Sequence, residues 1–238
     1  MKSNKLCQQR SRRQVFTLTA FLAFTYYEIK MKAKPFDKYW NEYDRWYDEH
    51  EPAYKAELNA VKDLIPDGRG LEIGVGTGRF AMPFQVRFGL DPSLNMLLAA
   101  KKRGIRVVQS IGENLPFKND SFHFILIVVT LCFLDDVLKV IQESIRTLKH
   151  NGYLITGMIN KNSLLGIEYQ KTKKKNPFYR LARFMPPEKI LRMFHETGLQ
   201  FIDSRQALFR AWHKSDKDET PKIGYNQGGF VVLKAQKI

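Results

Sequence analysis

The sequence predicts an α/β fold in which helices cover both faces of a mostly parallel, seven-stranded sheet. Seven apolar runs of strand length recur along the chain, at residues 71–75, 86–90, 106–109, 122–130, 153–159, 199–208 and 229–235. The first five alternate with segments of helical spacing, which is typical of parallel sheets. The run at 122–130 is apolar at nearly every position, as expected of a strand buried on both faces.

Helices are expected both before the first strand and directly after it. Aromatic residues recur before the first strand at steps of three and four, which is helical spacing and predicts one or two amphipathic helices. These residues are Phe36, Tyr39, Trp40, Tyr43, Trp46, Tyr47 and Tyr54. After the first strand, segment 79–85 allows barely two turns of helix, so the first crossover lies near the lower limit for a βαβ unit.

Three further helices are marked by capping residues and apolar spacing. Asp91-Pro92-Ser93 predicts the start of a helix that runs to about Arg103. Asp135-Asp136 predicts the start of the next helix, whose apolar residues form one face before Asn151-Gly152 ends it. The third helix is expected over 187–197, after a basic linker.

Charge and cysteine content restrict the class of protein. Lys and Arg exceed Asp and Glu by 15, and residues 1–30 carry +5 of this excess. Such an excess suggests nucleic acid or anionic surfaces as partners. The two cysteines, Cys7 and Cys132, lie far apart, so neither a disulfide framework nor a cysteine-based metal site is expected. The histidines show no metal-ligand spacing, and we expect no metal and a reducing, cytoplasmic location.

The first thirty residues differ from the rest of the chain. A basic segment precedes a mostly apolar run that is shorter than the roughly 20 residues needed to cross a bilayer. The run also lacks a small-x-small cleavage site. We interpret residues 1–30 as a basic extension that is poorly ordered or arises from an upstream translation start. Residues 31–238 then form one domain, with a helical lid over 31–66 and a substrate-side insertion over 160–186.

The sequence GLEIGVGTGRF, residues 70–80, places three glycines at alternate positions directly after the first strand. Open α/β sheets bind ligands at this end, and glycine lets the backbone turn sharply and approach a ligand. Dinucleotide sites use G-x-G-x-x-G, and Glu72 would repel a pyrophosphate but attract an ammonium group. Asp91 can accept hydrogen bonds from both hydroxyls of a ribose. These residues suit S-adenosylmethionine, a cationic ligand without phosphate.

Four segments resemble, in order and spacing, the motifs of class I S-adenosylmethionine-dependent methyltransferases: LEIGVGTGRF, GLDPS, GENLPFKNDSF and the Asp135-Asp136 helix with its Asn-Gly end. The chain is most similar to the small methyltransferases of the ubiquinone and menaquinone biosynthesis type (type 11). The similarity runs from about Phe36 to the C-terminus. It implies a Rossmann-like sheet of seven strands, with the last strand antiparallel, and S-adenosylmethionine as the cofactor.

The resemblance also implies which residues hold the cofactor. Glu72 and the glycine loop would line its methionine half, Asp91 its ribose, and the segment after the third strand its adenine. The family often has Asp at the position of Ile111, so adenine recognition is left to the backbone or to Glu113. His123 replaces another common Asp, at a position expected to be structural. The expected cofactor-binding residues are Glu72, Gly74, Gly76, Thr77, Gly78, Asp91, Pro92, Gly112, Glu113, Asn114 and Thr130.

The sequence does not identify a catalytic residue. Methyl transfer from a sulfonium is an in-line displacement in which positioning supplies much of the catalysis, and a base is optional. Aromatic residues of the lid could face a cationic centre, although aromatics at helical spacing are usually core residues. His50 is the histidine considered as a base, and Cys132 is interpreted as a buried filler. The candidates for acceptor contact are Tyr39, Tyr43, Trp46, Tyr47, Glu168, Tyr169 and Tyr179.

The leading interpretation is a cytoplasmic methyltransferase that acts on a small amine, phenol or quinone-type molecule. An RNA methyltransferase is the alternative within the same class. The basic runs at 101–103 and 171–175 favour it, but no recognisable RNA-binding module accompanies them. A non-catalytic protein that binds S-adenosylmethionine and regulates a partner is the third interpretation. The acceptor atom and the oligomeric state stay open.

Overall fold

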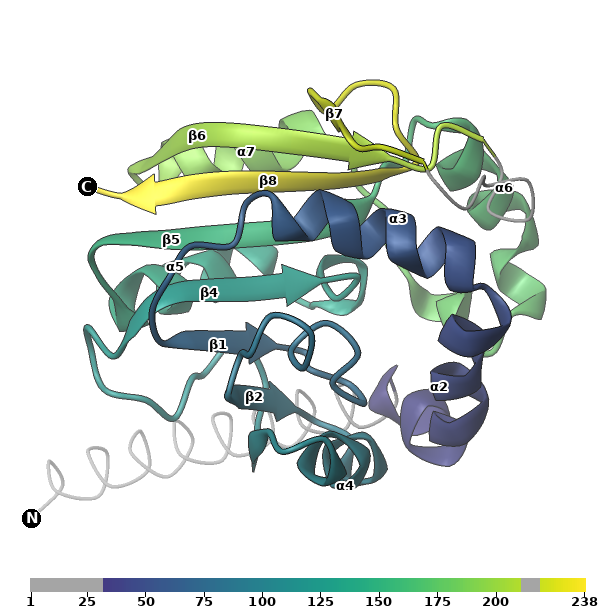
Figure 1. The fold of residues 1–238 in the computed structure, drawn as a ribbon, viewed down its shortest axis with the longest axis horizontal. Helices are drawn as coiled ribbons and strands as arrows, with labels where there is room; N and C mark the ends of the chain where they lie inside the picture. The colour runs from purple at the N-terminus through teal and green to yellow at the C-terminus, as the bar shows by residue number, and fades with distance from the viewer. Residues whose placement is uncertain (1–31, 211–218) are drawn as a thin grey trace, which may run out of the picture.

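The computed structural model describes residues 32–210 and 219–238, so the interpretation of residues 1–30 lies outside the described residues. Helices and strands alternate along most of the chain (Figure 1). In chain order the elements are α2 (Trp40–Glu49), α3 (Glu51–Lys62), β1 (Gly70–Ile73), β2 (Phe88–Asp91), α4 (Leu94–Lys102), β3 (Arg106–Gln109), β4 (Phe122–Val128), η1 (Leu131–Phe133), α5 (Val137–Thr147), β5 (Leu148–Ile159), α6 (Leu164–Thr172), η2 (Lys173–Lys175), η3 (Tyr179–Leu181), α7 (Pro187–Glu196), β6 (Leu199–Ala207), β7 (Lys222–Ile223) and β8 (Phe230–Lys237).

One sheet runs through the molecule, with its strands in the order β3-β2-β1-β4-β5-β8-β6-β7. The five strands from β3 to β5 are mutually parallel, and Leu71 of β1 lies between Phe88 of β2 and Ile125 of β4. β8 inserts antiparallel between β5 and β6. This confirms the predicted Rossmann-like sheet with its last strand antiparallel. The sheet has eight strands rather than seven, because the two-residue β7 pairs antiparallel with β6.

Helices cover both faces of the sheet, as predicted. In Figure 1, α3 crosses in front of the sheet beside β8 and β5, whereas α5 and α7 lie behind it. The core on the first face includes Phe124 of β4 and Ala60 of α3. The core on the second face includes Ile125 of β4 and Ile141 of α5. β4 therefore sends alternate side chains into two apolar cores, which explains its nearly continuous apolar sequence.

The crossover between β1 and β2 contains no helix, and the prediction of one over 79–85 is wrong. These residues form consecutive turns. Pro83 has no N–H to donate to a helical ladder, and Gln85 turns the chain at a φ of +56°. Phe80 and Ala81 are nevertheless buried in the same core as α3, so turns fill this part of the core in place of a helix.

Helix α5 is shorter than predicted, and β5 is longer. The helix starts as expected, where Asp136 Oδ1 accepts from the N–H of Lys139 at 2.9 Å and satisfies a donor that has no partner inside the helix. It ends at Thr147 because Leu148 adopts an extended backbone and pairs with Phe122 of β4. The Asn151-Gly152 pair, which we expected to end the helix, lies inside β5.

Candidate functional site

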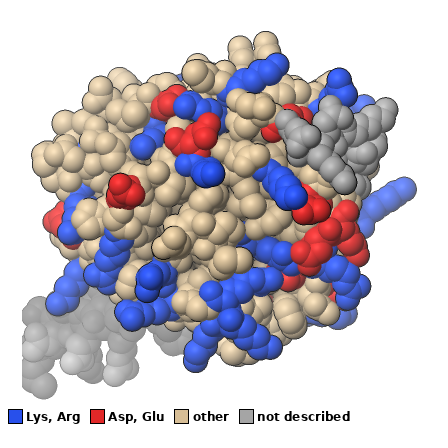
Figure 2. Space-filling view, viewed as in Figure 1, with Lys and Arg blue, Asp and Glu red and all other residues tan. Residues whose placement is uncertain are grey.

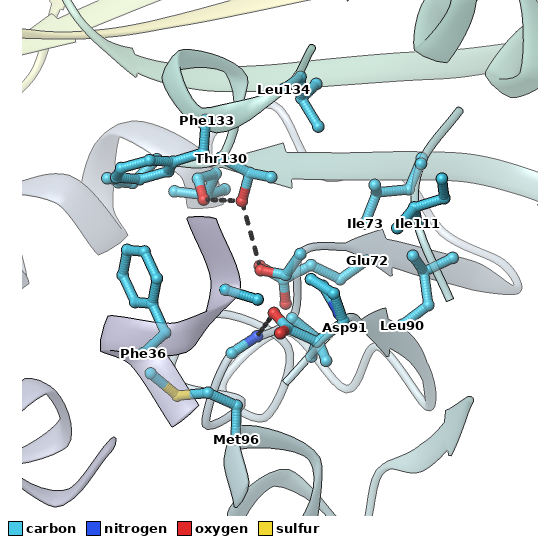
Figure 3. Close-up of a pocket in the computed structure, with 18 of the residues that line it drawn as sticks. Phe36, Glu72, Ile73, Leu90, Asp91, Met96, Ile111, Thr130, Phe133 and Leu134 are labelled. Carbon is cyan, nitrogen blue, oxygen red and sulfur yellow. Dashed lines mark hydrogen bonds between the residues drawn. The ribbon is translucent and has the colours of Figure 1, made fainter. Parts of the chain in front are cut away.

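A pocket lies at the carboxyl ends of β1, β2 and β4 (Figure 3), where open α/β sheets bind ligands. It encloses about 970 Å³, including open solvent at its mouth. Most of the predicted cofactor-binding residues line it, whereas Gly78 and Asn114 lie outside the lining. The lining members of that set are Glu72, Gly74, Gly76, Thr77, Asp91, Pro92, Gly112, Glu113 and Thr130.

The three glycines of the loop after β1 have different surroundings. All three have positive φ, at +70° for Gly74, +51° for Gly76 and +87° for Gly78, and this backbone conformation favours glycine. A Cβ on Gly74 would meet Thr130 at 2.4 Å, and a Cβ on Gly78 would meet Ile105 at 2.4 Å. A Cβ on Gly76 would meet nothing within 4 Å. Gly76 is therefore the one of these three whose missing side chain leaves open space in the pocket.

Glu72 places a buried carboxylate at the floor of the pocket. Its side chain is 1% exposed, and Oε2 has no hydrogen-bond partner among the described residues. Burial raises the pKa of Glu72 well above its usual value, although a backbone N–H at Ala81 acts in the opposite direction. A buried carboxylate without a partner is costly. Because this one lines a pocket, it can accept from a cationic ligand group.

Asp91 ends β2 and lies directly against the glycine loop (Figure 3). Its carboxylate oxygens accept from the backbone N–H of Gly76 at 3.0 Å and from that of Ser93 at 2.9 Å. These two bonds orient the carboxylate, and each oxygen retains capacity for another donor. Burial raises the pKa of Asp91 to about 6, although the two N–H groups lower it. The group is thus mostly ionised at neutral pH and is suited to accept from two hydroxyls.

The side of the pocket predicted to hold adenine is formed by the loop after β3. Ile111, Gly112 and Glu113 line it. Glu113 Oε1 accepts from the backbone N–H of Asp135 at 3.1 Å and from that of Asp136 at 3.4 Å. Glu113 therefore ties this loop to the start of α5. Ile111 contributes an apolar surface to the same wall, so polar contacts to a base would come from backbone groups or from Glu113.

The first part of the predicted lid, residues 32–49, borders the pocket. From here on we call these residues the lid. Its first part contributes Lys32, Ala33 and Phe36 to the lining. Lys32 pairs with Asp135 at the start of α5. On the other side, Asp37 Oδ1 accepts from Ser93 Oγ at 2.8 Å and from the N–H of Asn95 at 3.0 Å. The lid is thus anchored to both edges of the pocket.

Asp44 of α2 fastens the lid to the glycine loop. Its carboxylate accepts from Thr77 Oγ1 at 2.5 Å, from Arg79 at 2.8 Å and from Arg103 at 2.9 Å. Burial alone would raise the pKa of Asp44, but these hydrogen bonds lower it to about 2. These donors, two guanidinium groups and a hydroxyl, occupy the carboxylate, so Asp44 serves the fold rather than a ligand.

Two of the predicted acceptor contacts, Tyr43 and Tyr47, line the pocket, and their hydroxyl oxygens lie 3.0 Å apart. Tyr169 and Tyr179 lie outside the lining but belong to the aromatic cluster that continues from it. Their ring centroids are 4.9 Å apart, and that of Tyr179 is 5.8 Å from that of Phe133, a lining residue. The structure therefore brings these four candidates into one aromatic region, and the ring of Trp46 joins it at 5.3 Å from that of Tyr47.

Tyr39, Trp46 and Glu168 lie outside the lining of the pocket. Trp46 stacks on the ring of His50 at a centroid distance of 4.6 Å, and His50 is not a lining residue either. Burial raises the pKa of Cys132 to about 12, as expected of a buried filler and not of a thiolate nucleophile. Among the described residues, no group of His, Cys, Asp and Glu side chains could hold a metal ion.

Several lining residues were not singled out from the sequence. Phe36 belongs to the aromatic run before the first strand, but its spacing alone marks it as a core residue. Met96 lies on the buried face of α4, where the same argument applies. Phe133 and Leu134 follow β4, and the end of a predicted parallel strand is the signal that could have identified them. No helix in residues 32–210 and 219–238 is long and apolar enough to cross a membrane.

Comparisons with known proteins agree with this geometry. The family described as "Methyltransferase domain" matches residues 71–156. An uncharacterized protein of Methanocaldococcus jannaschii is 47% identical over 203 residues, which cover 85% of this chain and 98% of the relative. A Thermotoga maritima crystal structure, titled as an SAM-dependent methyltransferase and possible histamine N-methyltransferase, is 44% identical with a TM-score of 0.84. That match covers 87% of this chain and 100% of the other.

A more distant relative carries a defined activity in its name. The demethylmenaquinone methyltransferase of Bacillus cytotoxicus is 23% identical over 204 residues, which cover 71% of this chain and 86% of that protein. The two closer matches span nearly the whole length of their partners at identities well above 30%. The chain therefore belongs to the type 11 family of class I methyltransferases and is an S-adenosylmethionine-dependent methyltransferase.

Proposed function

We propose that the protein transfers the methyl group of S-adenosylmethionine to a small molecule with an amine, phenol or quinone-type acceptor group. The observation that supports this most is the set of aromatic lid residues that line the pocket. The lid covers it with Phe36, Tyr43 and Tyr47, and bonds at Asp37 and Asp44 tie the lid down. A concave, largely apolar pocket bordered in this way favours a small-molecule acceptor.

The residues present suit the cofactor. Glu72 Oε2 is buried and without a partner in the described part of the chain, so it would receive the ammonium group. Gly76 leaves open space for the methionine portion. Asp91, held by two backbone N–H groups, would accept from the two ribose hydroxyls, and Gly112 with Glu113 would border the adenine. When bound, the cofactor supplies a methyl carbon activated by the positive sulfonium.

The protein's own contribution to the reaction is positioning. Glu72, Gly76 and Asp91 would hold the cofactor, whose methyl carbon would be displaced from sulfur by an acceptor lone pair, and the acceptor's proton would pass to solvent. Holding the reactants in line is worth on the order of 7–11 kcal/mol. No residue of the described lining is assigned as a general base.

Two measurements test the proposed function. Isothermal titration calorimetry with S-adenosylmethionine and with S-adenosylhomocysteine should show binding at one site. Incubation with methyl-labelled cofactor and a fractionated metabolite extract should then transfer label to a small-molecule fraction. Binding without transfer to any fraction would favour the non-catalytic, regulatory alternative. No binding of either compound would contradict the proposal.

The RNA methyltransferase alternative depends on surface charge. Figure 2 shows Lys and Arg side chains over much of one face, but acidic and uncharged side chains lie among them. Transfer of labelled methyl to tRNA, with an affinity that falls steeply as salt increases, would support this alternative over a small-molecule acceptor.

A further inference from the structure

Five aromatic rings form a continuous wall along the cofactor pocket. The residues Phe133, Phe36, Tyr43, Tyr47 and Phe80 all line the pocket. Successive ring centroids in this order lie 5.0, 5.4, 5.6 and 6.0 Å apart, and each pair meets edge to face, which is a favoured geometry for aromatic pairs. We call these five residues the ring wall.

The ring wall lies away from the part of the pocket assigned to the adenine. In Figure 3, Phe36 and Phe133 lie on one side of Glu72 and Asp91, and Ile111 lies on the other. In the proposed function, Glu72 and Asp91 hold the ammonium group and the ribose, and the adenine lies toward Ile111. The space beside the ring wall is therefore where a methyl acceptor would approach the cofactor.

Two hydroxyl groups interrupt the apolar surface of the ring wall. Tyr43 and Tyr47 are one turn apart on α2, and their hydroxyl oxygens lie 3.0 Å apart. One hydroxyl donates to the other, and no further hydrogen bond joins either of them to a described residue. Two hydroxyls have two protons, and the bond between them uses one. One O–H donor is therefore left without a partner in the described part of the chain.

The threonine hydroxyls of the same lining already have acceptors. Thr77 Oγ1 donates to the Asp44 carboxylate at 2.5 Å, and Thr130 Oγ1 donates to the carbonyl oxygen of Val128 at 2.9 Å. A ligand could receive a hydrogen bond from either threonine only if a bond within the protein broke. The tyrosine pair can donate to a ligand without such a loss.

Burial keeps the tyrosine pair protonated. The Tyr47 side chain is 5% exposed, and Tyr43 is half-buried. Burial raises the pKa of both hydroxyls above the ordinary tyrosine value, although the hydrogen bond from Tyr47 lowers that of Tyr43. Both groups are therefore uncharged at neutral pH. The pair is suited to donate a hydrogen bond and unsuited to act as a general base.

We propose that the Tyr43–Tyr47 pair determines specificity for the methyl acceptor, by donating its remaining O–H to an uncharged oxygen or nitrogen of a planar aromatic molecule that packs against the ring wall. This inference rests on the proposed function. Aromatic molecules pack well against such rings. A molecule without an accepting atom would leave the O–H buried and unpaired, which is costly. A protonated ammonium group has no lone pair and could not accept from it.

Calorimetry with two probes of similar shape tests this proposal. The full chain, saturated with S-adenosylhomocysteine, is titrated with acetophenone, whose carbonyl oxygen accepts a hydrogen bond, and with isopropylbenzene, which has no accepting atom. The double variant Tyr43→Phe/Tyr47→Phe keeps both rings and removes both hydroxyls. We expect it to bind acetophenone about 10-fold more weakly than the wild type does, while isopropylbenzene changes by less than about twofold. Comparing each probe between two proteins cancels the hydration of the free probe.

Single variants and a control assign the effect to the pair. Tyr43→Phe and Tyr47→Phe should each lose less acetophenone affinity than the double variant, because the remaining hydroxyl still carries an O–H. Tyr39→Phe removes a hydroxyl from a lid residue outside the lining. It is the matched control and should bind both probes as the wild type does. Saturation with S-adenosylhomocysteine is verified for every variant.

Infrared spectroscopy tests the same hydrogen bond without a variant. Acetophenone isotopically labelled at its carbonyl carbon is bound to the wild-type protein saturated with S-adenosylhomocysteine. Its carbonyl stretch should lie at lower frequency than in an apolar solvent, because an O–H donor weakens the C=O bond. This measurement keeps the proposal testable even if the double variant does not fold.

Three outcomes would overturn the inference while the proposed function still stood. The first is an equal change in affinity for both probes in the double variant. The second is a carbonyl stretch that matches its value in an apolar solvent. The third is no binding of either probe to a wild-type protein that binds S-adenosylhomocysteine normally. Failure of S-adenosylhomocysteine itself to bind would contradict the proposed function and the inference together.

Discussion

Asp44 and Asp91 lie on opposite sides of the glycine loop and differ in their electrostatic state. Asp44, on the lid, accepts from two arginines and a threonine, and these bonds lower its pKa to about 2 against the effect of burial. Asp91, at the end of β2, accepts from backbone N–H groups alone, and burial raises its pKa to about 6. The first carboxylate is saturated by the protein and holds the lid closed. The second keeps acceptor capacity for a ligand, which is why we assign it to the ribose.

The largest expected effect comes from Asp91→Ala. Each hydrogen bond to a charged group is worth about 1.5–3 kcal/mol, so losing two should weaken binding of S-adenosylhomocysteine by about 100-fold or more. Because Asp91 also orients Gly76 and Ser93, Asp91→Asn serves as the control that retains one acceptor oxygen and should lose less. Calorimetry measures both constants. Unchanged affinity in a folded Asp91→Ala protein would contradict the ribose assignment.

The pH dependence of stability should follow the buried carboxylates. The folded-state pKa values of Asp91 and Glu57 are about 6 and about 8, above their ordinary values of 3.8 and 4.5. The folded protein therefore retains protons that the unfolded chain releases, and its free energy of unfolding should fall as pH rises from about 4.5 to about 8. Since one pKa unit corresponds to about 1.4 kcal/mol, the fall should amount to several kcal/mol, and Glu72, whose pKa burial also raises, should add to it.

Urea unfolding at pH 5 and pH 8 measures this change. Asp44 acts in the opposite sense, because its pKa is lowered to about 2: its contribution is present above its ordinary pKa and is lost as pH falls toward 2. With these pKa values, the free energy of unfolding should be greatest near pH 4 to 5. Glu57→Gln should reduce its decline at higher pH. A stability that rises from pH 5 to pH 8 would contradict this account.

Asp44→Ala should destabilise the protein by about 2 kcal/mol, because it leaves two guanidinium groups without their shared partner while partial exposure softens the loss. Asp48→Ala removes another partner of Arg79, but the Asp48 side chain is 64% exposed, so it should change stability by less than about 1 kcal/mol. Thermal or urea unfolding compares the two variants. Equal effects would mean that the interaction of the lid with the loop does not depend on Asp44.

Gly76→Ala should have the smallest effect on stability and a clear effect on binding. The left-handed backbone at this position costs a non-glycine residue about 1 kcal/mol, and the added Cβ meets no protein atom within 4 Å. The same Cβ would project into the space proposed for the cofactor, so affinity should fall. Gly74→Ala adds a contact of 2.4 Å with Thr130 and should be less stable than Gly76→Ala. The reverse order of stability would contradict the description of the loop.

Much of the sheet could be predicted because its signals are local. The strand at 106–109 has the predicted bounds, and Ser93 and Asp136 cap the helices that they were expected to start. The missing helix at 79–85 could not be predicted from apolar content alone, because Phe80 and Ala81 are buried in turns as they would be in a helix. Pro83 was the available signal against a helix.

The candidate site likewise contains residues that the sequence could predict and residues that it could not. Residues within or directly after the end of a predicted strand, such as Glu72 in β1 and Asp91 at the end of β2, were found because parallel strands bring their carboxyl ends together. The lid contacts were not found, since Asp44 reaches Arg79 across 35 positions and Arg103 across 59.

By itself, the sequence determined the succession of strands along the chain, the glycine loop at the end of the first of them, and the acidic residue that follows the second. These follow from periodicity and from the chemistry of neighbouring residues. Only the tertiary structure decided which carboxylates are saturated and which retain acceptor capacity, and which aromatic rings line the pocket. Burial and the choice of partner depend on segments that are distant in the chain, and no local pattern specifies how those segments meet.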